Sequence, residues 1–600
     1  MKIKVANYIA DFLANKGVTD IFTITGGGAM HLNDAFGHHG KLRCIYNHHE
    51  QACAIAAEGY ARLTGKIAAV CVTSGPGGTN AITGVLGGWQ DSIPMFVVSG
   101  QVKRVTTTWS TQVPLRQLGD QEFQIAECVK IMTKYSVMVT KPEEIRYHLE
   151  KAWYIANHGR KGPVWIDVPL DVQAAMVEEE ELYPFDSLTY EKEKIPVYDE
   201  ELTGKVLEKL LSAQRPVIYV GTGVRLANAQ KLLTDVIQKL KIPVVTAWNA
   251  HDLLEDEFPY YCGRPGTVGT RGGNFVVQNA DVLLVIGCRM NIRLIGYNYE
   301  TYAKNAYKIM VDIDENELNK PTFCPNLKIH ADLVNVLNSI NNHVKDWESS
   351  EEHLRWLKWC KDINGKYPAV LEKYKQKNTP VNPYVFIEAL FEQLKNDDVI
   401  VCGNGSACVV TFQAAKIKKG QRVFTNSGCA AMGYGFPAAI GCALAEEDHR
   451  IICIDGDGSF QMNMQELQTV VHNKLKLKLF LLNNNGYHSI RQTQKNLFSG
   501  NLVGVSEDNG ISFPNMEKIA EAYGIEYRAI REMDTMERII KDVLDSETAV
   551  ICEIFLDVEQ GFEPKLSSKI LEDGTIVSPE IDDMYPFLDR EEYLQTKWSK

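Results

Sequence analysis

The chain has 600 residues, of which 45% are hydrophobic and 23% charged, and a net charge of −13. That length allows three or four domains of ordinary globular composition. The acidic balance, without a dense Lys and Arg block, argues against a nucleic-acid partner. No apolar run approaches the ~20 residues needed to span a bilayer, which argues against a membrane protein.

The fourteen cysteines are scattered without CxxC pairs. This spacing argues against a structural zinc site and is typical of reduced thiols in a cytosol. The N-terminal sequence MKIKVANYIADFLANKG has the pattern of an amphipathic helix and not that of a secretory signal. We therefore expect a soluble cytoplasmic protein.

Residues 1–180 alternate short apolar runs with helical patterns, which predicts a doubly wound α/β domain. Strands are expected at 20–24, 68–72, 95–99 and 164–168.

An Ala-rich helix is expected within this domain, from Glu50 to Thr64, with Gly65 ending it. By position alone, the carboxylate of Glu50 complements the helix dipole. Glu58 and Arg62 lie four residues apart on the same helix and are interpreted as a surface ion pair.

A charged linker at 175–200 leads to a second α/β unit, 195–345. This unit opens with a strand at 216–220 followed by Gly221-Thr222-Gly223. A GxG turn after a strand indicates dinucleotide binding only weakly, because such turns also serve as plain strand–helix connections.

A helical, charge-rich segment at 345–380 leads to the third α/β domain, 370–560. Its first strand, 399–402, is followed by Gly403-Asn404-Gly405-Ser406, a loop that can offer backbone and hydroxyl donors to a diphosphate. The tail, 561–600, is polar and lacks periodicity, which predicts disorder. The alternative is that 584–588 docks over the active site.

The most informative stretch follows, with two predicted parallel strands joined by a helix. Asp457 comes just after the first strand and Asn484 just after the second, at the sheet edge where ligands bind. Together with a free backbone carbonyl near Gly486, they supply hard oxygen ligands for Mg²⁺. The alternative is that Asp457 only caps a helix and Asn484 only turns the chain.

The turn around Asp457 also suits a phosphate. Gly456 and Gly458 let the backbone approach closely, and the helix that begins near Ser459 offers its N-terminal amides.

GDGSF followed at this distance by NNNG resembles the signature of the thiamine diphosphate (ThDP) enzymes. Three further segments narrow the resemblance to the acetohydroxyacid (acetolactate) synthase-like branch, over about residues 1–560. The resemblance implies three doubly wound parallel-sheet domains, which are a pyrimidine-binding, a central Rossmann-like and a diphosphate-binding domain.

The stretch NHHEQ around Glu50 resembles the family's Arg-His-Glu-Gln segment, whose Glu contacts the aminopyrimidine ring. A carboxyl hydrogen-bonded to that ring favours the imino tautomer, which can remove the C2 proton of the thiazolium. The resemblance therefore makes Glu50 a catalytic residue.

Other motifs carry further implied contacts. SGPGGTN resembles the pyrimidine-pocket loop, which assigns cofactor contacts to Pro76 and Asn80. Gln101 ends a GQV-like stretch and would reach the substrate. Met432, in GCAAMGYGFPAAIG, corresponds to the Met that holds the cofactor bent, as a deformable apolar wedge.

The middle unit resembles the FAD-binding domain of the acetohydroxyacid synthases through GTVG, GCRMNIR and VDID segments. The alternative is a domain that keeps the fold and has lost the flavin. The implied FAD contacts are Gly221, Gly223, Gly266, Gly269, Arg289, Arg293 and Asp312.

The implied activity is ThDP- and Mg²⁺-dependent decarboxylation of pyruvate, a 2-oxo acid, with transfer of the hydroxyethyl unit to a carbonyl acceptor. In the family each site joins the first domain of one subunit to the third of another, so a homodimer or homotetramer is implied. The alternatives are a simple decarboxylase or lyase that releases an aldehyde, and a binding protein that keeps the fold without catalysis.

The acceptor side departs from the acetolactate synthases. Asp120, Thr267 and Thr493 stand where those enzymes have a Phe, a Met and a Trp, whereas Lys134 and Arg293 on the donor side are retained. A larger, more polar pocket suits a keto-sugar acceptor, of which a nucleotide-linked keto-sugar is one form. The alternative is drift at these positions without a change of substrate.

Overall fold

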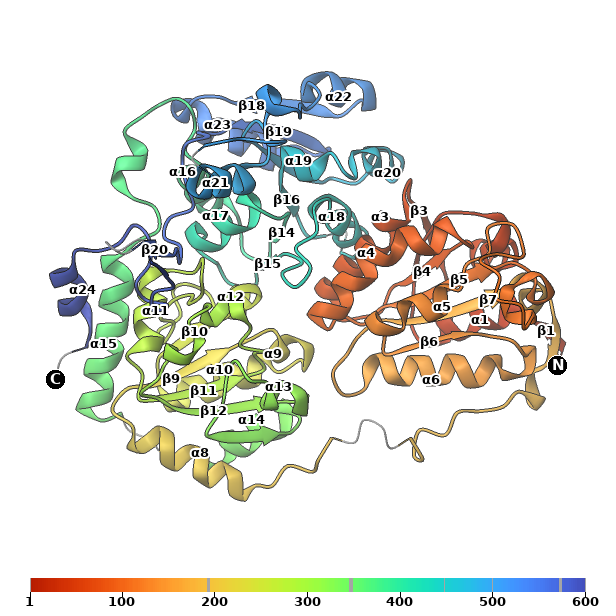
Figure 1. The fold of residues 1–600 in the computed structure, drawn as a ribbon, viewed down its shortest axis with the longest axis horizontal. Helices are drawn as coiled ribbons and strands as arrows, with labels where there is room; N and C mark the ends of the chain where they lie inside the picture. The colour runs from red at the N-terminus through yellow and green to blue at the C-terminus, as the bar shows by residue number, and fades with distance from the viewer. Residues whose placement is uncertain are drawn as a thin grey trace.

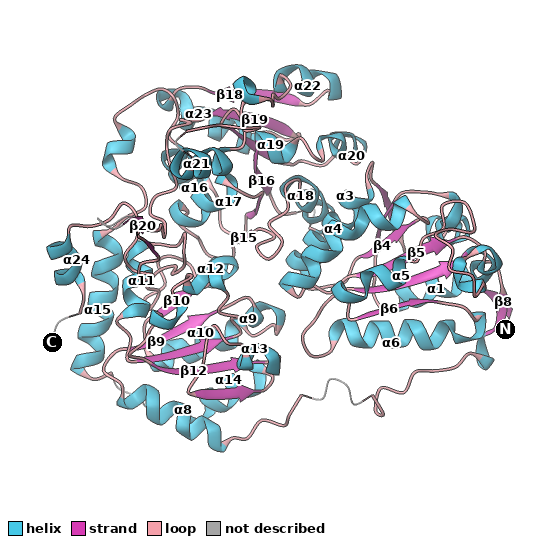
Figure 2. Cartoon of the chain, viewed as in Figure 1, coloured by secondary structure: helices cyan, strands magenta, loops and turns pink. Residues whose placement is uncertain are grey.

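The computed structural model describes residues 2–190, 195–344, 349–446, 448–498, 500–570 and 575–598. Parts of the predicted linkers and tail, 191–194, 345–348, 571–574 and 599–600, lie outside the described residues. The chain forms three α/β units, each built on one parallel sheet (Figure 1). Helices lie on both sides of these sheets (Figure 2), so the predicted fold class is confirmed.

The N-terminal unit has a sheet of six parallel strands. They are β2 (Asp20–Thr23), β3 (Arg43–Tyr46), β4 (Ala69–Val72), β5 (Phe96–Gln101), β6 (Tyr135–Met138) and β7 (Val164–Pro169), in the order β3-β2-β4-β5-β7-β6. The four predicted strands are the inner ones and are fully buried. The sequence did not reveal β3 and β6 because both are edge strands with half-exposed side chains and so lack a continuous apolar run.

The helices of this unit surround the sheet. They are α1 (Val5–Asn15), α2 (Met30–Gly37), α3 (Glu50–Thr64), α4 (Pro76–Asp91), α5 (Ile125–Cys128), α6 (Ile145–Asn157) and α7 (Leu170–Gln173). A short antiparallel pair, β1 (Lys2–Lys4) with β8 (Met176–Glu178), ties the start of the unit to its end. The predicted stop of α3 is confirmed, since Gly65 adopts a left-handed conformation with φ +71° after Thr64.

The middle unit has five parallel strands in the order β10-β9-β11-β12-β13. Their bounds are β9 (Pro216–Val220), β10 (Val244–Thr246), β11 (Val282–Ile286), β12 (Tyr307–Asp312) and β13 (Leu327–His330). Its helices are α8 (Glu201–Ser212), α9 (Gly223–Leu226), α10 (Gln230–Leu240), α11 (Arg271–Gln278), α12 (Ile292–Ile295), α13 (Glu315–Asn319) and α14 (Leu333–His343). The helix α15 (Glu351–Lys366) then packs along α11.

The C-terminal unit repeats the strand order of the first. Its strands are β14 (Val399–Cys402), β15 (Arg422–Phe424), β16 (Ile451–Gly456), β17 (Lys478–Asn483), β18 (Glu526–Ile530) and β19 (Val550–Phe555), in the order β15-β14-β16-β17-β19-β18. Its helices are α16 (Pro383–Gln393), α17 (Ser406–Ala414), α18 (Gly435–Ala445), α19 (Asp457–Phe460), α20 (Leu467–His472), α21 (His488–Leu497), α22 (Met516–Tyr523) and α23 (Met533–Asp545).

In each of the three parallel sheets the first strand lies between the second and the third, as β14 lies between β15 and β16. The chain therefore leaves the first strand in opposite directions on either side, and a crevice opens at the carboxyl ends of the strands. Such switch points are where open α/β sheets bind ligands. In the middle and C-terminal units the glycine-rich loops lie at these switch points, after β9 and after β14.

The N- and C-terminal units meet where α4, α3 and α18 lie side by side (Figure 1). Glycines let these helices approach closely. A Cβ on Gly59 would lie 2.5 Å from the Ala438 carbonyl oxygen, and one on Gly441 would lie 2.0 Å from the Ala56 carbonyl oxygen. The two units are therefore joined through backbone-to-backbone contact and have little freedom to slide.

The interpretation of Glu58 and Arg62 as a surface ion pair is wrong. Glu58 is 0% exposed and the Arg62 side chain 7% exposed, because both face the C-terminal unit across this helix contact. Tyr434 completes the group by donating a hydrogen bond of 2.7 Å to Glu58. The four-residue spacing of Glu58 and Arg62 along α3 cannot reveal that the C-terminal unit covers this face of the helix.

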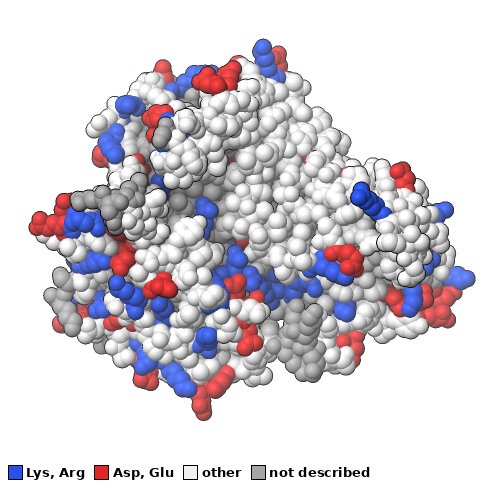
Figure 3. Space-filling view, in the orientation of Figure 1, with Lys and Arg blue, Asp and Glu red and all other residues white. Residues whose placement is uncertain are grey.

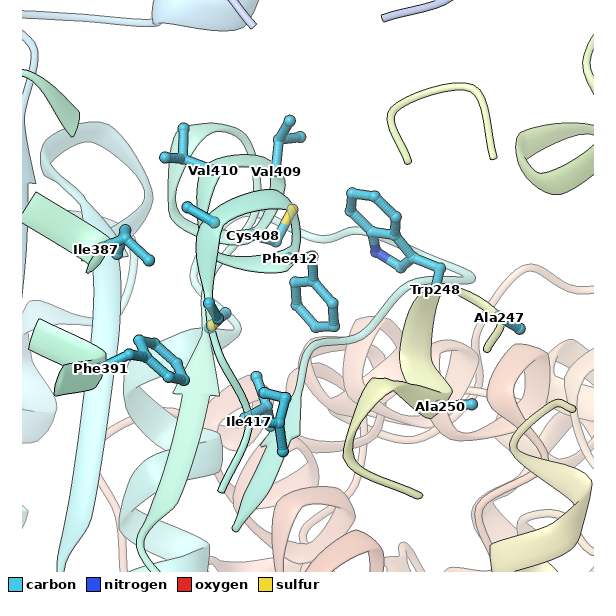
Figure 4. Packing of buried hydrophobic residues seen from close by; sticks show 14 of the residues in the cluster. Ala247, Trp248, Ala250, Ile387, Phe391, Cys408, Val409, Val410, Phe412 and Ile417 are labelled. Atoms are coloured by element: carbon cyan, nitrogen blue, oxygen red, sulfur yellow. The ribbon is translucent and has the colours of Figure 1, made fainter. Parts of the chain in front are cut away.

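The middle and C-terminal units are joined by aromatic packing. The ring of Trp248 stacks on that of Phe412, with centroids 5.1 Å apart and planes 12° apart. Figure 4 shows Trp248 approaching Phe412 and Cys408 of α17 from the middle unit. This contact fixes the middle unit beneath the glycine-rich edge of the third sheet.

The prediction that the tail is disordered is wrong for its described parts, 561–570 and 575–598. They contain β20 (Lys569–Ile570), β21 (Ile576–Val577) and α24 (Arg590–Thr596) and pack on the middle unit. Met584 is fully buried, and Arg271 of α11 donates hydrogen bonds to the carbonyls of Met584 and Pro586. These hydrogen bonds to another unit, together with ion pairs inside the tail such as that of Arg590 with Asp583, order this polar segment.

All fourteen cysteines are free thiols, as their spacing predicts. Within the described part of the chain, no helix combines the length and the apolar character that a membrane span needs.

We expect Gly59→Ala to lower the free energy of unfolding by about 1–3 kcal/mol, because the added methyl group overpacks the helix contact. Gly204→Ala is the matched control, since a Cβ on this α8 glycine meets nothing within 4 Å. That change should instead stabilise the chain by about 0.4–1 kcal/mol. Urea denaturation followed by circular dichroism measures both, and equal effects of the two variants would contradict the described helix contact.

Candidate active site

A buried polar corner lies at the carboxyl ends of β16 and β17. Asp457 is the first residue of α19, and its two carboxylate oxygens accept the backbone N–H groups of Gly458 at 2.8 Å and Gly486 at 3.1 Å. Asn484 follows β17, and its Nδ2 donates to Ser406 Oγ at 3.3 Å. The fold thus brings together residues 29 and 78 positions apart along the chain.

This corner fits a hard divalent cation. Burial raises the pKa of the Asp457 carboxyl to about 7, even though two N–H groups hydrogen-bond it, so a nearby positive charge would favour its ionised form. Asn484 is 5% exposed, and its Oδ1 is buried without a hydrogen-bond partner among the described residues. One carboxylate, one amide oxygen and the carbonyls of this turn form a donor set typical of Mg²⁺.

The turn after β17 fixes the backbone conformation of Gly486. Its φ is +132°, and a Cβ there would lie 1.8 Å from the Val505 carbonyl oxygen. Arg491 donates to the carbonyl of Asn484 at 3.0 Å and to that of Asn485.

No group of three or more His, Cys, Asp or Glu side chains suited to a metal occurs in the described part of the chain.

The loop after β14 forms the other wall of the same crevice. Gly405 has φ +60° and open space where a Cβ would be, and α17 begins at the next residue, Ser406. A backbone of this kind at a helix N-terminus is suited to a diphosphate. Asn404 instead donates its amide to the Ala430 carbonyl at 3.1 Å, which ties this loop to the segment carrying Met432.

Gly456 also faces open space, whereas Ser459 is used inside the protein. The Ser459 hydroxyl accepts the Gly433 N–H at 2.9 Å and hydrogen-bonds Asp455. Only the backbone of Ser459 is therefore free for a phosphate, while its side chain holds the residue after Met432. Met432 itself is half-buried at the edge of the crevice.

The N-terminal unit presents a second polar group. Glu50 is the first residue of α3, and its Oε2 accepts the Asn80 Nδ2–H at 3.0 Å. Asn80 lies in the first turns of α4, which begins at Pro76. Pro76 and Asn80 are exposed, so this half of the predicted site lies open on the surface of the single chain.

Gln101 ends β5 and is only 1% exposed. Its Nε2 donates to the Phe123 carbonyl at 2.7 Å and to Asp167 Oδ2 at 3.1 Å, and its Oε1 accepts the Val102 N–H at 3.0 Å. Both amide hydrogens are therefore engaged within the protein. Any contact with a substrate would use the second lone pair of Oε1.

Sequence reasoning missed Asp167, which holds Gln101 in this position. Burial raises the pKa of its carboxyl to about 7, although Ser99 and Gln101 donate hydrogen bonds to it. A signal was available in the buried strand VWIDVP, where one carboxylate interrupts an apolar run.

A cavity of about 780 Å³ opens at the carboxyl edge of the middle sheet. Five of the seven predicted FAD contacts line it: Gly221, Gly223, Arg289, Arg293 and Asp312. The other two, Gly266 and Gly269, do not belong to its lining, because Gly266 bonds Asn274 and Gly269 packs on the Arg264 carbonyl. The lining contains two glycine turns, Gly221-Thr222-Gly223 after β9 and Gly287 after β11. Glycine turns beside basic side chains suit a nucleotide diphosphate.

The first unit also contributes to this cavity, through Arg160 and Lys161, which sequence reasoning missed. Arg160 pairs with Asp314 and Glu317 of the middle unit, each at 2.9 Å. Figure 3 shows Lys and Arg side chains gathered in the hollow between these two units. Burial raises the pKa of Asp312, which faces the same cavity, to about 6.

The residues that depart from the acetolactate synthases are spread over three units. Asp120 is exposed, and the next residue lies against the pyrimidine-pocket loop, since a Cβ on Gly75 would be 2.6 Å from the Gln121 carbonyl. Thr267 bonds the backbones of Arg293 and Leu566, and Thr493 is exposed on α21. No hydrogen bond among the described residues links the three.

Lys134 lies elsewhere. It precedes β6, whereas Gln101 ends the parallel strand β5, so the two residues lie at opposite edges of the same sheet. Its ammonium donates to the His158 carbonyl at 2.6 Å. Arg293 lies over the Trp248 ring, with its guanidinium carbon 5.0 Å from the ring centroid.

Comparison with known proteins covers all three units. The chain matches three parts of the thiamine pyrophosphate enzymes, which are the N-terminal TPP binding domain over residues 3–124, the central domain over 203–340 and the C-terminal TPP binding domain over 403–554.

Curated relatives extend over nearly the whole chain. The acetolactate synthase isozyme 1 large subunit of Escherichia coli K12 is 30% identical over 93% of this chain and 95% of the relative. The isozyme 2 large subunit of the same organism is 30% identical over 93% and 96%. Acetolactate synthase 2, chloroplastic, of Nicotiana tabacum is 30% identical over 94% and 84%. The chain therefore belongs to the thiamine pyrophosphate enzymes, in which it is related to the acetolactate synthase large subunits.

Proposed function

We propose that this protein is a Mg²⁺-dependent ThDP carboligase that decarboxylates pyruvate and transfers the two-carbon unit to a carbonyl acceptor. The observation that carries the proposal is the buried corner of Asp457, Asn484 and Gly486, with its unpartnered amide oxygen. The relatives named acetolactate synthase support the same class of reaction.

The residues around the corner have separate tasks. Asp457, Asn484 and the Gly486 carbonyl would hold Mg²⁺, and the backbones of Gly405 and Gly456 would receive the diphosphate. Bound ThDP supplies the carbon that attacks the 2-oxo acid and the ring that accepts electrons as CO₂ leaves. Met432, at the edge of the crevice, would press on the cofactor as an apolar wedge.

Glu50 would hold and move a proton at the pyrimidine ring. Its carboxyl is oriented by the amide of Asn80 at 3.0 Å, and Glu50 is partly exposed and Asn80 is exposed on the single chain. Gln101, fixed by Asp167 and Phe123, would orient the substrate with its carbonyl oxygen. These roles agree with the geometry and rest on the family resemblance.

A second copy of the chain would complete the site. Pro76 and Asn80 are exposed, although a pyrimidine pocket must exclude water. Large apolar side chains are also exposed on the neighbouring segment, with Val105 at 72%, Trp109 at 58% and Phe123 at 40%. An apolar rim around half of a binding site supports a homodimer, or a homotetramer built from it.

FAD is the proposed occupant of the middle cavity. The support is the pair of glycine turns, the four basic residues Arg160, Lys161, Arg289 and Arg293, and the acidic Asp312 at the end of β12. A nucleotide diphosphate would satisfy the basic groups and a ribose hydroxyl the carboxylate. The proposal is tested by the absorption spectrum of the purified protein and by titration with FAD and with ADP.

The function itself is tested by incubation with pyruvate, ThDP and Mg²⁺, with products identified by mass spectrometry. CO₂ release together with a ligated product supports the proposal. Acetaldehyde as the sole product would show that the protein is a decarboxylase without ligation activity. The absence of CO₂ release with every acceptor would overturn the proposal.

Asp457→Ala should lower the affinity for ThDP by more than about 100-fold at ordinary Mg²⁺, since changes outside the ligand sphere already cost about 10- to 100-fold. The apoprotein should stay folded, because burial of this carboxylate disfavours its charged form in the metal-free state. Calorimetric titration measures the affinity. Asp508→Ala, at an exposed aspartate of the same unit, is the control, and equal affinities for the two variants would count against the metal site.

Glu50→Gln should reduce kcat by about 10²- to 10⁴-fold while ThDP still binds, because only the proton-carrying carboxyl is removed. Glu517→Gln changes an exposed first-turn glutamate of α22 and controls for helix-dipole effects. Steady-state kinetics with pyruvate separates the two. A Glu50→Gln enzyme with near-normal turnover would show that another residue moves the proton.

We propose that the acceptor is a keto-sugar. The specific candidate is a keto-sugar linked to a nucleotide. Gln121, the residue after Asp120, lies against the pyrimidine-pocket loop, which supports a place for Asp120 near the substrate. Ligation of pyruvate to a 4-keto-deoxysugar nucleotide should be faster than acetolactate formation, and Asp120→Phe should raise acetolactate formation by about tenfold or more. If the parent enzyme forms acetolactate rapidly and Asp120→Phe does not change that rate, these positions have drifted without a change of substrate. Asp120→Asn keeps a polar wall and serves as the control.

A further inference from the structure

The segment from Ser427 to Tyr434, which carries Met432, is held at its first end by the N-terminal unit. Asp91, the last residue of α4, accepts the Ser427 N–H on Oδ2 and the Gly428 N–H on Oδ1, both at 3.0 Å. Its side chain is 6% exposed. Gly428 is required here, since a Cβ would lie 2.7 Å from Asp91 Oδ1.

The other end of the segment is held by the same unit. The Tyr434 hydroxyl donates to Glu58 Oε2 at 2.7 Å, and both residues are buried. Arg62 joins the two attachments, because its Nη2 donates to Glu58 and, at 3.0 Å, to Asp91. One buried charged group, made of Glu58, Arg62 and Asp91, therefore hydrogen-bonds the segment both before and after Met432.

We propose that Asp91 is a positioning residue that sets the place of Met432 against the cofactor, acting from the opposite unit through the Ser427 and Gly428 amides. This inference rests on the proposed role of Met432 in holding ThDP. Hydrogen bonds from N–H groups to an ionised carboxylate are stronger and shorter than neutral ones, so the charge of Asp91 matters as well as its shape.

The segment needs such a support because its backbone is strained at Ala430, a non-glycine residue with φ +53°. From the C-terminal unit, the side chains of Asn404, Asn426, Ser459 and Asn463 hydrogen-bond its interior. A non-glycine residue with positive φ persists only where its surroundings hold it. Asp91 supplies the outer part of those surroundings.

Asp91 also lies where all three units meet. Arg289 of the middle unit is 3.7 Å from Asp91 Oδ1, and Asp91, Ser427 and Gly428 all line the middle cavity. Asp91, which hydrogen-bonds the Met432 segment, therefore also contacts Arg289 at the middle cavity. A purely local packing role would not require a charge shared among three units.

The test compares full-length Asp91→Asn with Asp235→Asn, which alters a partly exposed aspartate paired with Lys231 on α10. Asparagine keeps the size of the side chain and removes its charge. Three quantities are measured: amide hydrogen exchange at Ser427 and Gly428 without cofactor, ThDP affinity by calorimetry, and kcat and KM for pyruvate at saturating ThDP and Mg²⁺.

For Asp91→Asn we expect faster exchange of these two amides and weaker ThDP binding. We also expect kcat at saturating ThDP to fall by about 10- to 100-fold, the size of effect that a small misplacement produces, with KM for pyruvate nearly unchanged. Asp235→Asn should match the parent protein in every measurement. A folded Asp91→Asn enzyme whose kcat at saturating ThDP equals that of the parent would overturn the proposal, whatever its thermal stability.

Tyr434→Phe provides a second route if Asp91→Asn does not fold. It removes only the hydroxyl that bonds Glu58 at the far end of the segment, and it should lower kcat in the same direction with KM retained. An unchanged kcat in this variant would also count against positioning from the N-terminal unit. If the parent protein binds ThDP but releases no CO₂ from pyruvate, the proposed function fails, while amide exchange and ThDP affinity still decide the role of Asp91.

Discussion

The close crossing of α3 with α18 is the constraint on which the rest of the structure depends. Gly59 and Gly441 allow the two backbones to touch, so the N-terminal and C-terminal units cannot shift against each other without a clash. The crossing buries Glu58 and Arg62, and burial obliges these charges to find partners. Their partners are Tyr434 and Asp91, which in turn hold the segment before and after Met432.

The sites themselves follow from one feature of parallel sheets. Strands of this kind end at a common edge, and at the switch point the chain leaves that edge in two directions. The C-terminal unit places a carboxylate and an unpartnered amide oxygen there, and the middle unit places two glycine turns and basic side chains. Buried polar groups without protein partners are costly, so both crevices are suited to charged ligands that would complete them.

Sequence reasoning succeeded where a property is local. The inner strands were visible as continuous apolar runs, and the end of α3 was marked by Gly65. It failed where exposure depends on another unit: the edge strands β3 and β6 looked unlike strands, and a buried ion pair looked like a surface one. Asp167, Arg160 and Lys161 were missed because their importance arises only from what the fold places beside them.

By itself the sequence determined the three α/β units, the glycine-rich turns after β9, β14 and β16, and the family to which these turns belong. Each of these is encoded within a few consecutive residues, through hydrophobic periodicity or the backbone freedom of glycine. Only the tertiary structure decided which polar groups share a site, which charges are buried and where the tail docks. Those outcomes depend on contacts between residues hundreds of positions apart, such as Arg271 with Met584, and no local pattern records such a contact.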